Sequence, residues 1–537
     1  MKITRLLITV SLVLLLTEGF SSARQTGSSA PAQGSKLDLL IRGGQVIDGS
    51  GAPAVRADVG IIGDRIAFIG DAAKAGVSAT RTIDAAGLTV APGFIDPHTH
   101  TAEDLSHPQR KSNEDFLMQG VTTVITGNDG NSPFPIGETL NKWRQQGIGT
   151  NAALLVGQGT VRRRVMGMKD GEPSAEQLAQ MKALVRQGMD DGAVGLSTGL
   201  YYAPGSFSKT EEVIELAKVA AERGGVYDTH MRDESSYTIG LLGSIRETIR
   251  IGREAKLPVH ISHIKALGTD VWGQSKDAIE IIKQARKEGI NVTANQYPYT
   301  ASGTSLVSAL VPRWAEVGGN AELLKRIDDP NVRPKLVVEM AENLRRRGGA
   351  NSLLITSSRD RQLKGKRLDA IAKERNQTPI EAALAIIKTG DPSVASFNMN
   401  EQDIVNFMQQ EWVMTGSDGS GGHPRKYGTF PKKLREYVLT KKVISLPAAI
   451  RASSALTAET FRLPERGKLS LNHFADVIVF DEKTVADRAT YEEPELLAVG
   501  MKYVIVNGQI AVADGKFTGT LAGRPLAKSS QRSMSGK

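Results

Sequence analysis

The sequence contains no cysteine among its 537 residues. The chain can therefore form no disulfide, has no thiolate nucleophile and offers no sulfur ligand to a metal. Any metal site must be built from histidine and carboxylate side chains. Aromatic residues are also few, at 5%, whereas 55 residues are glycine. This composition suits a fold with many tight turns between strands and helices.

Long runs of one charge are missing as well. Lys and Arg number 67 and Asp and Glu 58, for a formal net charge of +9, yet the densest basic runs, 162–164 and 345–347, are only three residues long. A nucleic-acid-binding protein would carry a basic stripe interleaved with aromatic residues, so we expect no nucleic-acid partner. A scattered positive charge favours anionic small molecules instead.

Residues 1–23 have the pattern of a secretory signal peptide. Lys2 and Arg5 form a positively charged start, residues 6–16 an apolar core, and small residues up to Ala23 a cleavage site. The apolar core is short for a bilayer span, which weighs against the alternative, an uncleaved membrane anchor. We expect export to the periplasm or the extracellular space. No later apolar segment is long enough to span a membrane, so the mature form is expected to have no membrane partner.

Both ends of the expected mature chain read as β-structure. After a Ser-, Gly- and Pro-rich linker (24–36), residues 37–92 contain short apolar runs separated by Gly-Gly and Gly-Asp turns, and residues 464–522 repeat this texture. We expect these two segments to pair into one small β-sandwich. Residues 523–537 are expected to form a flexible tail.

Between them, residues 93–463 alternate short apolar runs with helical patterns. Eight candidate strands end in the segments GFIDPHTH, VTTVITGND, AALLVGQG, AVGLSTG, GVYDTHM, VHISHIK, NVTANQYPY and WVMTGSDG. Eight strands with intervening helices predict an α/β fold of the (β/α)8, or TIM-barrel, type. An open doubly wound sheet is the alternative, but no Gly-rich dinucleotide loop follows the first strand. A break in the alternation predicts an insertion near 300–355, over the mouth of the barrel.

Four of the eight histidines follow apolar runs at the C-terminal ends of predicted strands, where TIM barrels carry their active sites. His98 and His100 are two residues apart on a strand, so their rings point to one side, as a metal would require. His230 and His263 each end another apolar run. Histidines of a surface loop or of the core are the alternative for these residues. His260 faces the other way on its strand and is expected to be structural.

Asp418 ends the last predicted strand, in the segment MTGSDGSGG. Ser-Asp-Gly is also common turn chemistry, but a closed barrel would bring this strand end beside the first. An aspartate beside a metal-bound water can accept its proton and pass it to a leaving nitrogen. Asp418 is therefore the candidate proton carrier.

Several motifs resemble those of the amidohydrolase superfamily and, within it, the D-aminoacylase (N-acyl-D-amino-acid deacylase) family. They cover nearly the whole expected mature chain and read APGFIDPHTH, GVTTVITGNDG, GLSTGLYYAPG, THMRDE, HISHIKALG, YPYTASGT, TGSDGSGGHPRKYGTFPKKL and GKLSLNHFADVIVFD. The combination of SHIK, YPY and GSDG followed by HPRKYGTFP is highly specific to this branch.

The resemblance implies a β-sandwich with a TIM barrel and the zinc-dependent hydrolysis of N-acyl-D-amino acids to a carboxylate and a free D-amino acid. It implies one metal position at His98 and His100 and another at His230 and His263, with Asp418 as the catalytic acid and base. It also implies that the substrate α-carboxylate is bound by Lys265, Tyr297 and Arg425.

The sequence departs from the family pattern at two points. The family commonly has a cysteine ligand in the motif GNCG, and Asp129 stands in its place here. A carboxylate can still ligate a metal or bridge two, so we expect one or two zinc ions, with a harder cation such as manganese as an alternative. Ser302 and Gly303 are exchanged relative to the family order. A hydroxyl near the substrate is therefore expected from Ser302 or Thr304, or is absent.

Two other functions remain open. A dipeptidase or a dihydroorotase-like cyclic-amide hydrolase would use the same scaffold, but such enzymes commonly carry a carboxylated lysine where this chain has Asp129. A non-catalytic exported binding protein is the more remote alternative, and it would predict an incomplete set of metal ligands. The expected partner is a small N-acyl amino acid, and the oligomeric state is not predicted.

Overall fold

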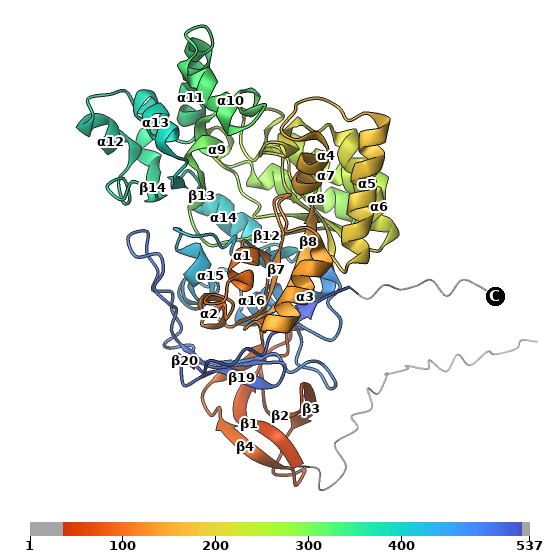
Figure 1. The fold of residues 1–537 in the computed structure, drawn as a ribbon. Coiled ribbons are helices and arrows are strands. Elements are labelled where there is room, and N and C mark those ends of the chain that lie inside the picture. Colours follow the sequence, from red (N-terminus) through yellow and green to blue (C-terminus); the bar gives the residue numbers. More distant parts are fainter. Residues whose placement is uncertain (1–35, 529–537) are drawn as a thin grey trace, which may run out of the picture.

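The computed structural model describes residues 36–528, which form a barrel, a separate β-sheet below it and an insertion above it (Figure 1). The expected signal peptide, nearly all of the expected linker and residues 529–537 lie outside the described residues.

Eight parallel strands form the barrel, each pairing with the next along the chain. The barrel closes between its last and first strands, where the Asp418 N–H donates to the His98 carbonyl (2.9 Å) and the His100 N–H to the Gly419 carbonyl (3.2 Å). The predicted TIM barrel is confirmed, with all eight strands in the predicted segments. They are β6 (Phe94–Thr99), β7 (Val121–Thr126), β8 (Asn151–Gly157), β9 (Gly195–Gly199), β10 (Val226–His230), β11 (Val259–Ile261), β12 (Val292–Gln296) and β16 (Val413–Thr415).

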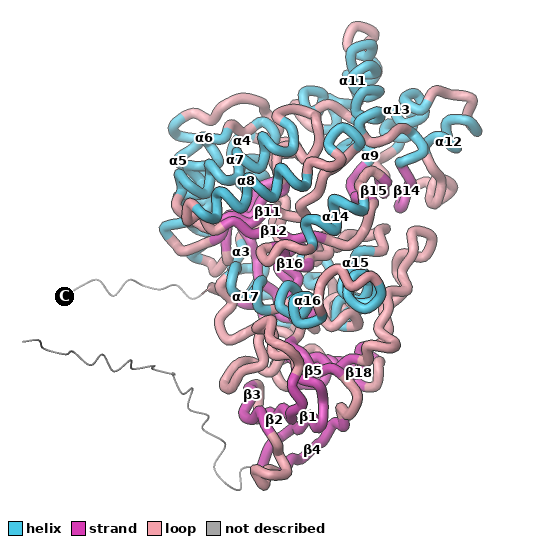
Figure 2. The backbone as a smooth tube through the Cα atoms, turned by 180° about the vertical axis from the view of Figure 1, so that it is seen from behind, coloured by secondary structure: helices cyan, strands magenta, loops and turns pink. Residues whose placement is uncertain are grey.

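Helices surround the barrel (Figure 2). Their apolar residues recur at helical spacing, as in α7, where Leu241, Ile245 and Ile249 are all buried. The helices are α3 (Ile136–Gln146), α4 (Gln158–Met166), α5 (Ala175–Asp190), α6 (Thr210–Glu222), α7 (Gly240–Ala255), α8 (Ser275–Lys287), α14 (Glu401–Met408), α16 (Leu446–Ser453) and α17 (Ala455–Phe461), with the shorter α1 (Ala102–Ser106), α2 (Glu114–Leu117) and α15 (Arg425–Lys432), a π-helix η5 (Lys433–Thr440) and the single turns η1 (Gly205–Phe207) and η2 (Thr269–Val271).

The insertion is longer than the expected 300–355. Strand β14 reads like a barrel strand in the sequence, but it pairs with β15 in a separate three-stranded sheet, so the excursion runs from Ala301 to Phe397. The insertion has an apolar core of its own, which includes Leu310, Leu336 and Leu353. Its elements are β13 (Ala301–Ser305), α9 (Leu306–Leu310), η3 (Arg313–Glu316), α10 (Asn320–Asp328), α11 (Arg333–Arg346), η4 (Ala350–Ser352), β14 (Leu353–Ser357), α12 (Leu368–Glu374), α13 (Pro379–Thr389) and β15 (Ser393–Phe397).

Strands from both ends of the chain form the second sheet, as the sequence predicts. It is one nine-stranded sheet, in which β5 of the N-terminal part pairs antiparallel with β17 of the C-terminal part. Its strands are β1 (Lys36–Val46), β2 (Val55–Ile62), β3 (Arg65–Gly70), β4 (Ser78–Asp84), β5 (Thr89–Pro92), β17 (Val477–Phe480), β18 (Met501–Val506), β19 (Gln509–Ala513) and β20 (Lys516–Phe517).

Residues 523–528 differ from the expectation of a flexible tail. Strand β21 (Pro525–Leu526) pairs in parallel with β8, and the Lys528 N–H donates to the Gly192 carbonyl. The buried Asn151 side-chain oxygen accepts a hydrogen bond from the Arg524 N–H (3.1 Å). These contacts fix the end of the described chain against the barrel.

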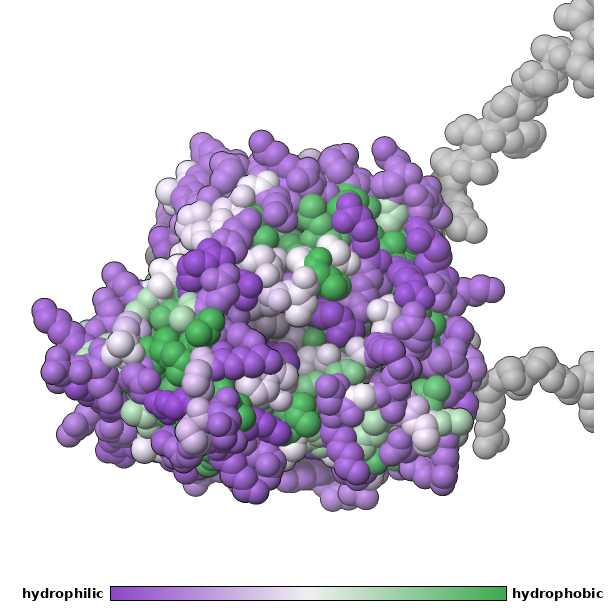
Figure 3. All heavy atoms as spheres, turned by 90° about the horizontal axis from the view of Figure 1, so that it is seen from above, coloured by the Kyte–Doolittle hydropathy of each residue, from purple (hydrophilic) through white to green (hydrophobic). Residues whose placement is uncertain are grey.

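Residues 36–528 contain no helix long and apolar enough to cross a membrane. The face of the molecule seen in Figure 3 is mostly hydrophilic, with smaller apolar patches between the polar residues.

Lys433 is buried beside β16, and no carboxylate of residues 36–528 pairs with it. Lys433 is 2% exposed, and its ammonium donates one hydrogen bond, to the Thr415 hydroxyl (2.8 Å). Burial lowers the pKa of Lys433 to about 7 because desolvation penalises the charged form.

We predict that Lys433 makes stability rise with pH above about 7. Between that pKa and the unfolded value of about 10.4, the folded state binds fewer protons than the unfolded state. The free energy of unfolding then increases by up to about 1.4 kcal/mol per pH unit. Lys433→Met should raise the melting temperature at pH 7 and flatten its increase between pH 7 and 9. The exposed Lys442→Met is the control, and an equal pH slope in all three proteins would contradict the prediction.

Candidate metal centre and binding pocket

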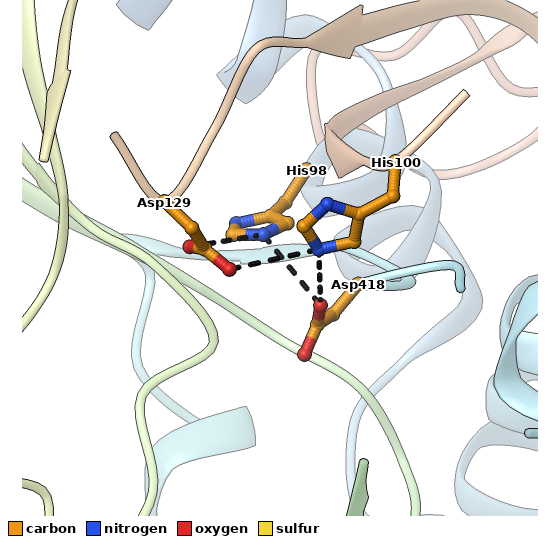
Figure 4. Close-up of side chains that lie close together, drawn as sticks. All are labelled: His98, His100, Asp129 and Asp418. Atoms are coloured by element: carbon orange, nitrogen blue, oxygen red, sulfur yellow. Dashed lines mark hydrogen bonds and ion pairs between the residues drawn. The ribbon is translucent and has the colours of Figure 1, made fainter. Parts of the chain in front are cut away.

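Six predicted site residues meet at the C-terminal mouth of the barrel. His98 and His230 lie at the ends of β6 and β10, and the other four follow strand ends: His100, Asp129, His263 and Asp418. Figure 4 shows four of the side chains pointing toward a common space. The closed barrel brings them together, because the C-terminal ends of all eight strands open on the same side.

Asp129 lies at the centre of this cluster. Its Oδ1 is 3.4 Å from His98 Nε2, 3.6 Å from His263 Nε2 and 3.8 Å from His230 Nδ1. Its Oδ2 is 3.6 Å from His100 Nε2. One carboxylate thus faces four imidazoles.

Asp418 lies on the other side of His98 and His100. Its Oδ1 is 3.0 Å from His100 Nε2 and 3.6 Å from His98 Nε2, and its Oδ2 is 2.8 Å from Arg425 Nη1. The Arg425 guanidinium, with His263 and His98, outweighs the effect of burial and holds the pKa of Asp418 well below its ordinary value. Asp418 is therefore ionised at neutral pH.

The cluster fits one or two divalent cations. Both ring nitrogens of His98, Asp129 Oδ1 and His230 Nδ1 are buried and have no hydrogen-bond partner, a costly state for polar atoms that a cation would relieve. Two ligand sets have their atoms within 4.8 Å of one another: His98, His100, Asp129 and Asp418, and Asp129, His230 and His263. Because Asp129 belongs to both sets, its carboxylate can bridge two ions.

The ionisation of His98 and Asp129 matches this role. Burial lowers the pKa of His98 to about 4, so its imidazole is neutral at pH 7. Burial would raise the pKa of Asp129, but the imidazoles of His98, His230 and His263 hold it well below its ordinary value. Neutral imidazole and ionised carboxylate are the forms that bind a metal.

At His263, burial and Lys265 lower the pKa, but Glu234, Asp418 and Asp129 outweigh them and raise it to about 9. This imidazole must therefore lose a proton to bind a metal.

The backbone at the strand ends is unusual. Asp129, His263 and Asp418 have φ values of +55°, +34° and +49°, which non-glycine residues rarely adopt. Gly127 has φ +84°, and a Cβ there would lie 2.6 Å from the Leu155 carbonyl oxygen, so only glycine allows this turn. Such positions cost about 1–3 kcal/mol each and concentrate at functional sites.

Two buried aspartates lie directly beneath the cluster. Asp96 accepts the N–H groups of His98 (3.1 Å) and Ser417 (3.0 Å), which links the first and last strands of the barrel. Asp228 accepts hydrogen bonds from Ser262 (2.9 Å) and Asn128 (3.1 Å). These two aspartates hold the strand ends that carry the cluster.

The cluster opens into a cavity of about 620 Å³. The other three predicted site residues, Lys265, Tyr297 and Arg425, line this cavity. The Tyr297 ring has Lys265 Nζ 5.7 Å from its centroid and Arg425 Cζ 4.7 Å from it, and the Tyr297 hydroxyl is buried without a hydrogen-bond partner. One wall of the cavity therefore offers two cations and a free hydroxyl beside the candidate metal centre.

Comparisons with known proteins agree with this geometry. Residues 81–512 match the amidohydrolase family. The chain belongs to this family. D-aminoacylase from Alcaligenes xylosoxydans xylosoxydans is 36% identical over 520 residues, which are 92% of this chain and 98% of that protein. The amidohydrolase described here therefore also belongs to the D-aminoacylase branch that its motifs indicate.

Two solved structures of related proteins share the fold. A D-aminoacylase studied for its binuclear metal centre has a TM-score of 0.79 at 35% identity, with 92% of this chain and 100% of that chain covered. N-acyl-D-glutamate deacylase from Bordetella bronchiseptica, complexed with zinc and a phosphonate inhibitor, has a TM-score of 0.78 at 31% identity, with the same coverage.

The amidohydrolase also contains a site residue that the sequence reasoning missed. Glu234 is buried, and its Oε1 lies 2.7 Å from Lys265 Nζ and 3.0 Å from His263 Nδ1. It orients both side chains and partly neutralises the lysine. The motif THMRDE already contains Glu234, four residues after His230, but nothing in its spacing showed that the loop returns to the neighbouring strand.

The structure also places His260, which is expected to be structural, and the hydroxyls of Ser302 and Thr304, which are expected near the substrate. His260 is buried and its ring nitrogens lie 2.9 Å from Thr293 Oγ1 and 2.7 Å from Asn295 Nδ2. Its expected structural role is confirmed. Ser302 and Thr304 both line the cavity. The Ser302 hydroxyl donates to Asn398 Oδ1 (3.2 Å), and the Thr304 hydroxyl lies 3.5 Å from that of Tyr202.

We predict that Asp129→Ala lowers the affinity of the amidohydrolase for divalent cations by about tenfold or more, because Asp129 serves both ligand sets. Metal content after dialysis, measured by inductively coupled plasma mass spectrometry, tests this. His107→Gln changes a histidine outside the cluster and should retain the wild-type content. Equal metal content in wild type and Asp129→Ala would refute Asp129 as a ligand.

Proposed function

We propose that this amidohydrolase hydrolyses the amide bond of N-acyl-D-amino acids. The proposal rests on one observation: Lys265, Tyr297 and Arg425 form a cavity wall directly beside a cluster that is suited to bind a metal. An anion held at that wall has its neighbouring amide next to the cluster. The relatives named D-aminoacylase and N-acyl-D-glutamate deacylase support the same substrate class.

The α-carboxylate of the substrate binds at this wall. Arg425 offers a planar guanidinium, and Tyr297 offers a hydroxyl that has no hydrogen-bond partner among the described residues. Lys265 adds a positive charge that Glu234 holds in place. Fixing the carboxylate selects which amide is cut and positions it for attack.

Zinc is the proposed cofactor, held as one or two ions by His98, His100, Asp129, His230 and His263. The related deacylase complexed with zinc supports this choice. Manganese is the alternative because Asp129 supplies a hard oxygen ligand. Such an ion, when bound, supplies a Lewis acid that polarises the amide carbonyl and lowers the pKa of water.

Asp418 carries the proton. Its carboxylate accepts a proton from the attacking water and gives it to the amide nitrogen as the C–N bond breaks. Arg425 lies against Asp418 and against the proposed carboxylate site. A bound substrate anion shares the guanidinium, which weakens the hold of Arg425 on Asp418 and raises the basicity of Asp418 when substrate is present.

Asp418 is the proposed proton carrier. Asp418→Asn keeps the shape of the side chain but removes its charge, so kcat for N-acetyl-D-amino acids should fall about 10²- to 10⁴-fold in the metal-loaded enzyme. Hydrolysis is measured by release of the free amino group. The wild type should prefer D over L substrates and should turn over neither dihydroorotate nor dipeptides efficiently. Undiminished turnover by Asp418→Asn would remove this residue from the mechanism.

The Tyr297 hydroxyl is the proposed neutral hydrogen-bond donor of the carboxylate wall. Tyr297→Phe deletes only the unpartnered hydroxyl, and KM for N-acetyl-D-leucine should rise about tenfold because a hydrogen bond to a charged group is lost, with kcat changed little. Tyr299→Phe is the matched control, since Tyr299 is buried nearby and its hydroxyl points to the Pro424 carbonyl. If both variants behave alike, Tyr297 does not bind the carboxylate.

We also propose that the enzyme is exported to the periplasm or beyond, by cleavage of a signal peptide near Ala23. The charged start and short apolar core of the first 23 residues support this proposal. N-terminal sequencing of the protein from a fractionated bacterial host tests it. Recovery of the chain in the cytoplasm with Met1 intact would contradict it.

A further inference from the structure

A buried arginine from the insertion lines the same cavity but belongs to neither the metal cluster nor the carboxylate wall. Arg347 directly follows α11 and is 2% exposed. Its Nε donates to the Ala309 carbonyl (3.0 Å) and its Nη2 to the Tyr201 hydroxyl (3.2 Å). Its Nη1 is buried without a hydrogen-bond partner.

The charge of Arg347 is not balanced. Within residues 36–528, no carboxylate lies at ion-pair distance from it, whereas the neighbouring Arg313 pairs with Glu316 and Arg346 with Glu342. A buried guanidinium without a counter-ion is costly, and a bound anion would offset that cost.

Arg347 is connected to the metal cluster through Tyr201. It contacts Tyr201, whose ring centroid lies 5.7 Å from that of His230. Arg425 instead contacts Asp418, on another side of the cluster. A substrate that holds its α-carboxylate at Arg425 thus has a second cationic group within the same cavity.

The surroundings of Arg347 are electrostatically positive. Arg313 Cζ lies 4.2 Å from the centroid of the Tyr201 ring. Two guanidinium groups at this tyrosine favour the binding of a ligand carboxylate beside it.

We propose that Arg347 and the Tyr201 hydroxyl form a second anion-binding site. The preferred substrates then carry an anionic group besides the α-carboxylate. This inference rests on the proposed function and narrows it to dianionic N-acyl-D-amino acids. The second carboxylate can come from an acidic side chain or from the far end of a dicarboxylic acyl group.

Three substrates separate these sources. N-acetyl-D-glutamate has the extra charge on the side chain, N-succinyl-D-glutamine has it on the acyl group, and N-acetyl-D-glutamine has none and nearly the shape of the first. We expect wild-type kcat/KM to be roughly tenfold or more higher for one dianionic substrate than for the neutral one. In Arg347→Gln that advantage should vanish through KM, with turnover of the neutral substrate unchanged within about twofold.

Two further variants distinguish binding from a structural role. Arg345→Gln removes an exposed cation of α11 that Asp270 and Glu342 already neutralise, and it should keep the wild-type preference. Arg347→Lys retains the charge and should keep part of the preference. Arg347→Gln that loses activity equally on all three substrates, or keeps the full preference, would overturn the proposal.

A binding experiment separates this inference from the proposed function. Calorimetric titration compares D-glutamate with D-glutamine, and succinate with succinamate, on wild type and Arg347→Gln. If wild type prefers the ligand with the extra carboxylate and Arg347→Gln does not, the second anion-binding site is supported even if no substrate is hydrolysed. Equal affinities in both proteins would refute it, whatever the hydrolysis assays show.

Discussion

The structure depends on one interaction, the convergence of imidazole nitrogens on the carboxylate of Asp129. The distances from Asp129 to His98, His100, His230 and His263 are 3.4–3.8 Å, too long for good hydrogen bonds and suited to an ion between the groups. The barrel closure, the positive φ values at the strand ends and the buried aspartates beneath all serve to hold these side chains in place.

Arg425 connects this centre with the proposed substrate-binding wall. The same guanidinium contacts Asp418 and lines the cavity beside Tyr297. In the proposed mechanism, substrate binding and proton transfer are therefore electrostatically coupled, since an anion that draws on Arg425 changes the basicity of Asp418. Glu234 has the corresponding position on the other side, where it contacts both Lys265 and His263. Each cation of the carboxylate wall is thus tied to a member of the metal cluster.

Much of this arrangement follows from the sequence. The regular alternation of strands and helices was sufficient to predict eight strands. Together with the period-two spacing of His98 and His100, it also predicted where the strand ends meet. The sequence did not reveal contacts made by loops. Glu234 lies in a loop whose course depends on packing, and Arg347 reaches the cavity only because the insertion folds over the barrel. The insertion also extends past the predicted end near 355, because β14 pairs with β15 in the separate sheet and not with a strand of the barrel.

The central claim is that Asp129 and the histidines share a cation. The most direct measurement is a crystal structure of the metal-loaded enzyme with anomalous scattering data collected at the absorption edge of zinc. The account predicts an anomalous peak about 2.0–2.2 Å from a carboxylate oxygen of Asp129 and about 2.0–2.1 Å from two of the imidazoles. A loaded crystal in which the ion lies elsewhere, or in which the Asp129 side chain turns away from it, would contradict the account.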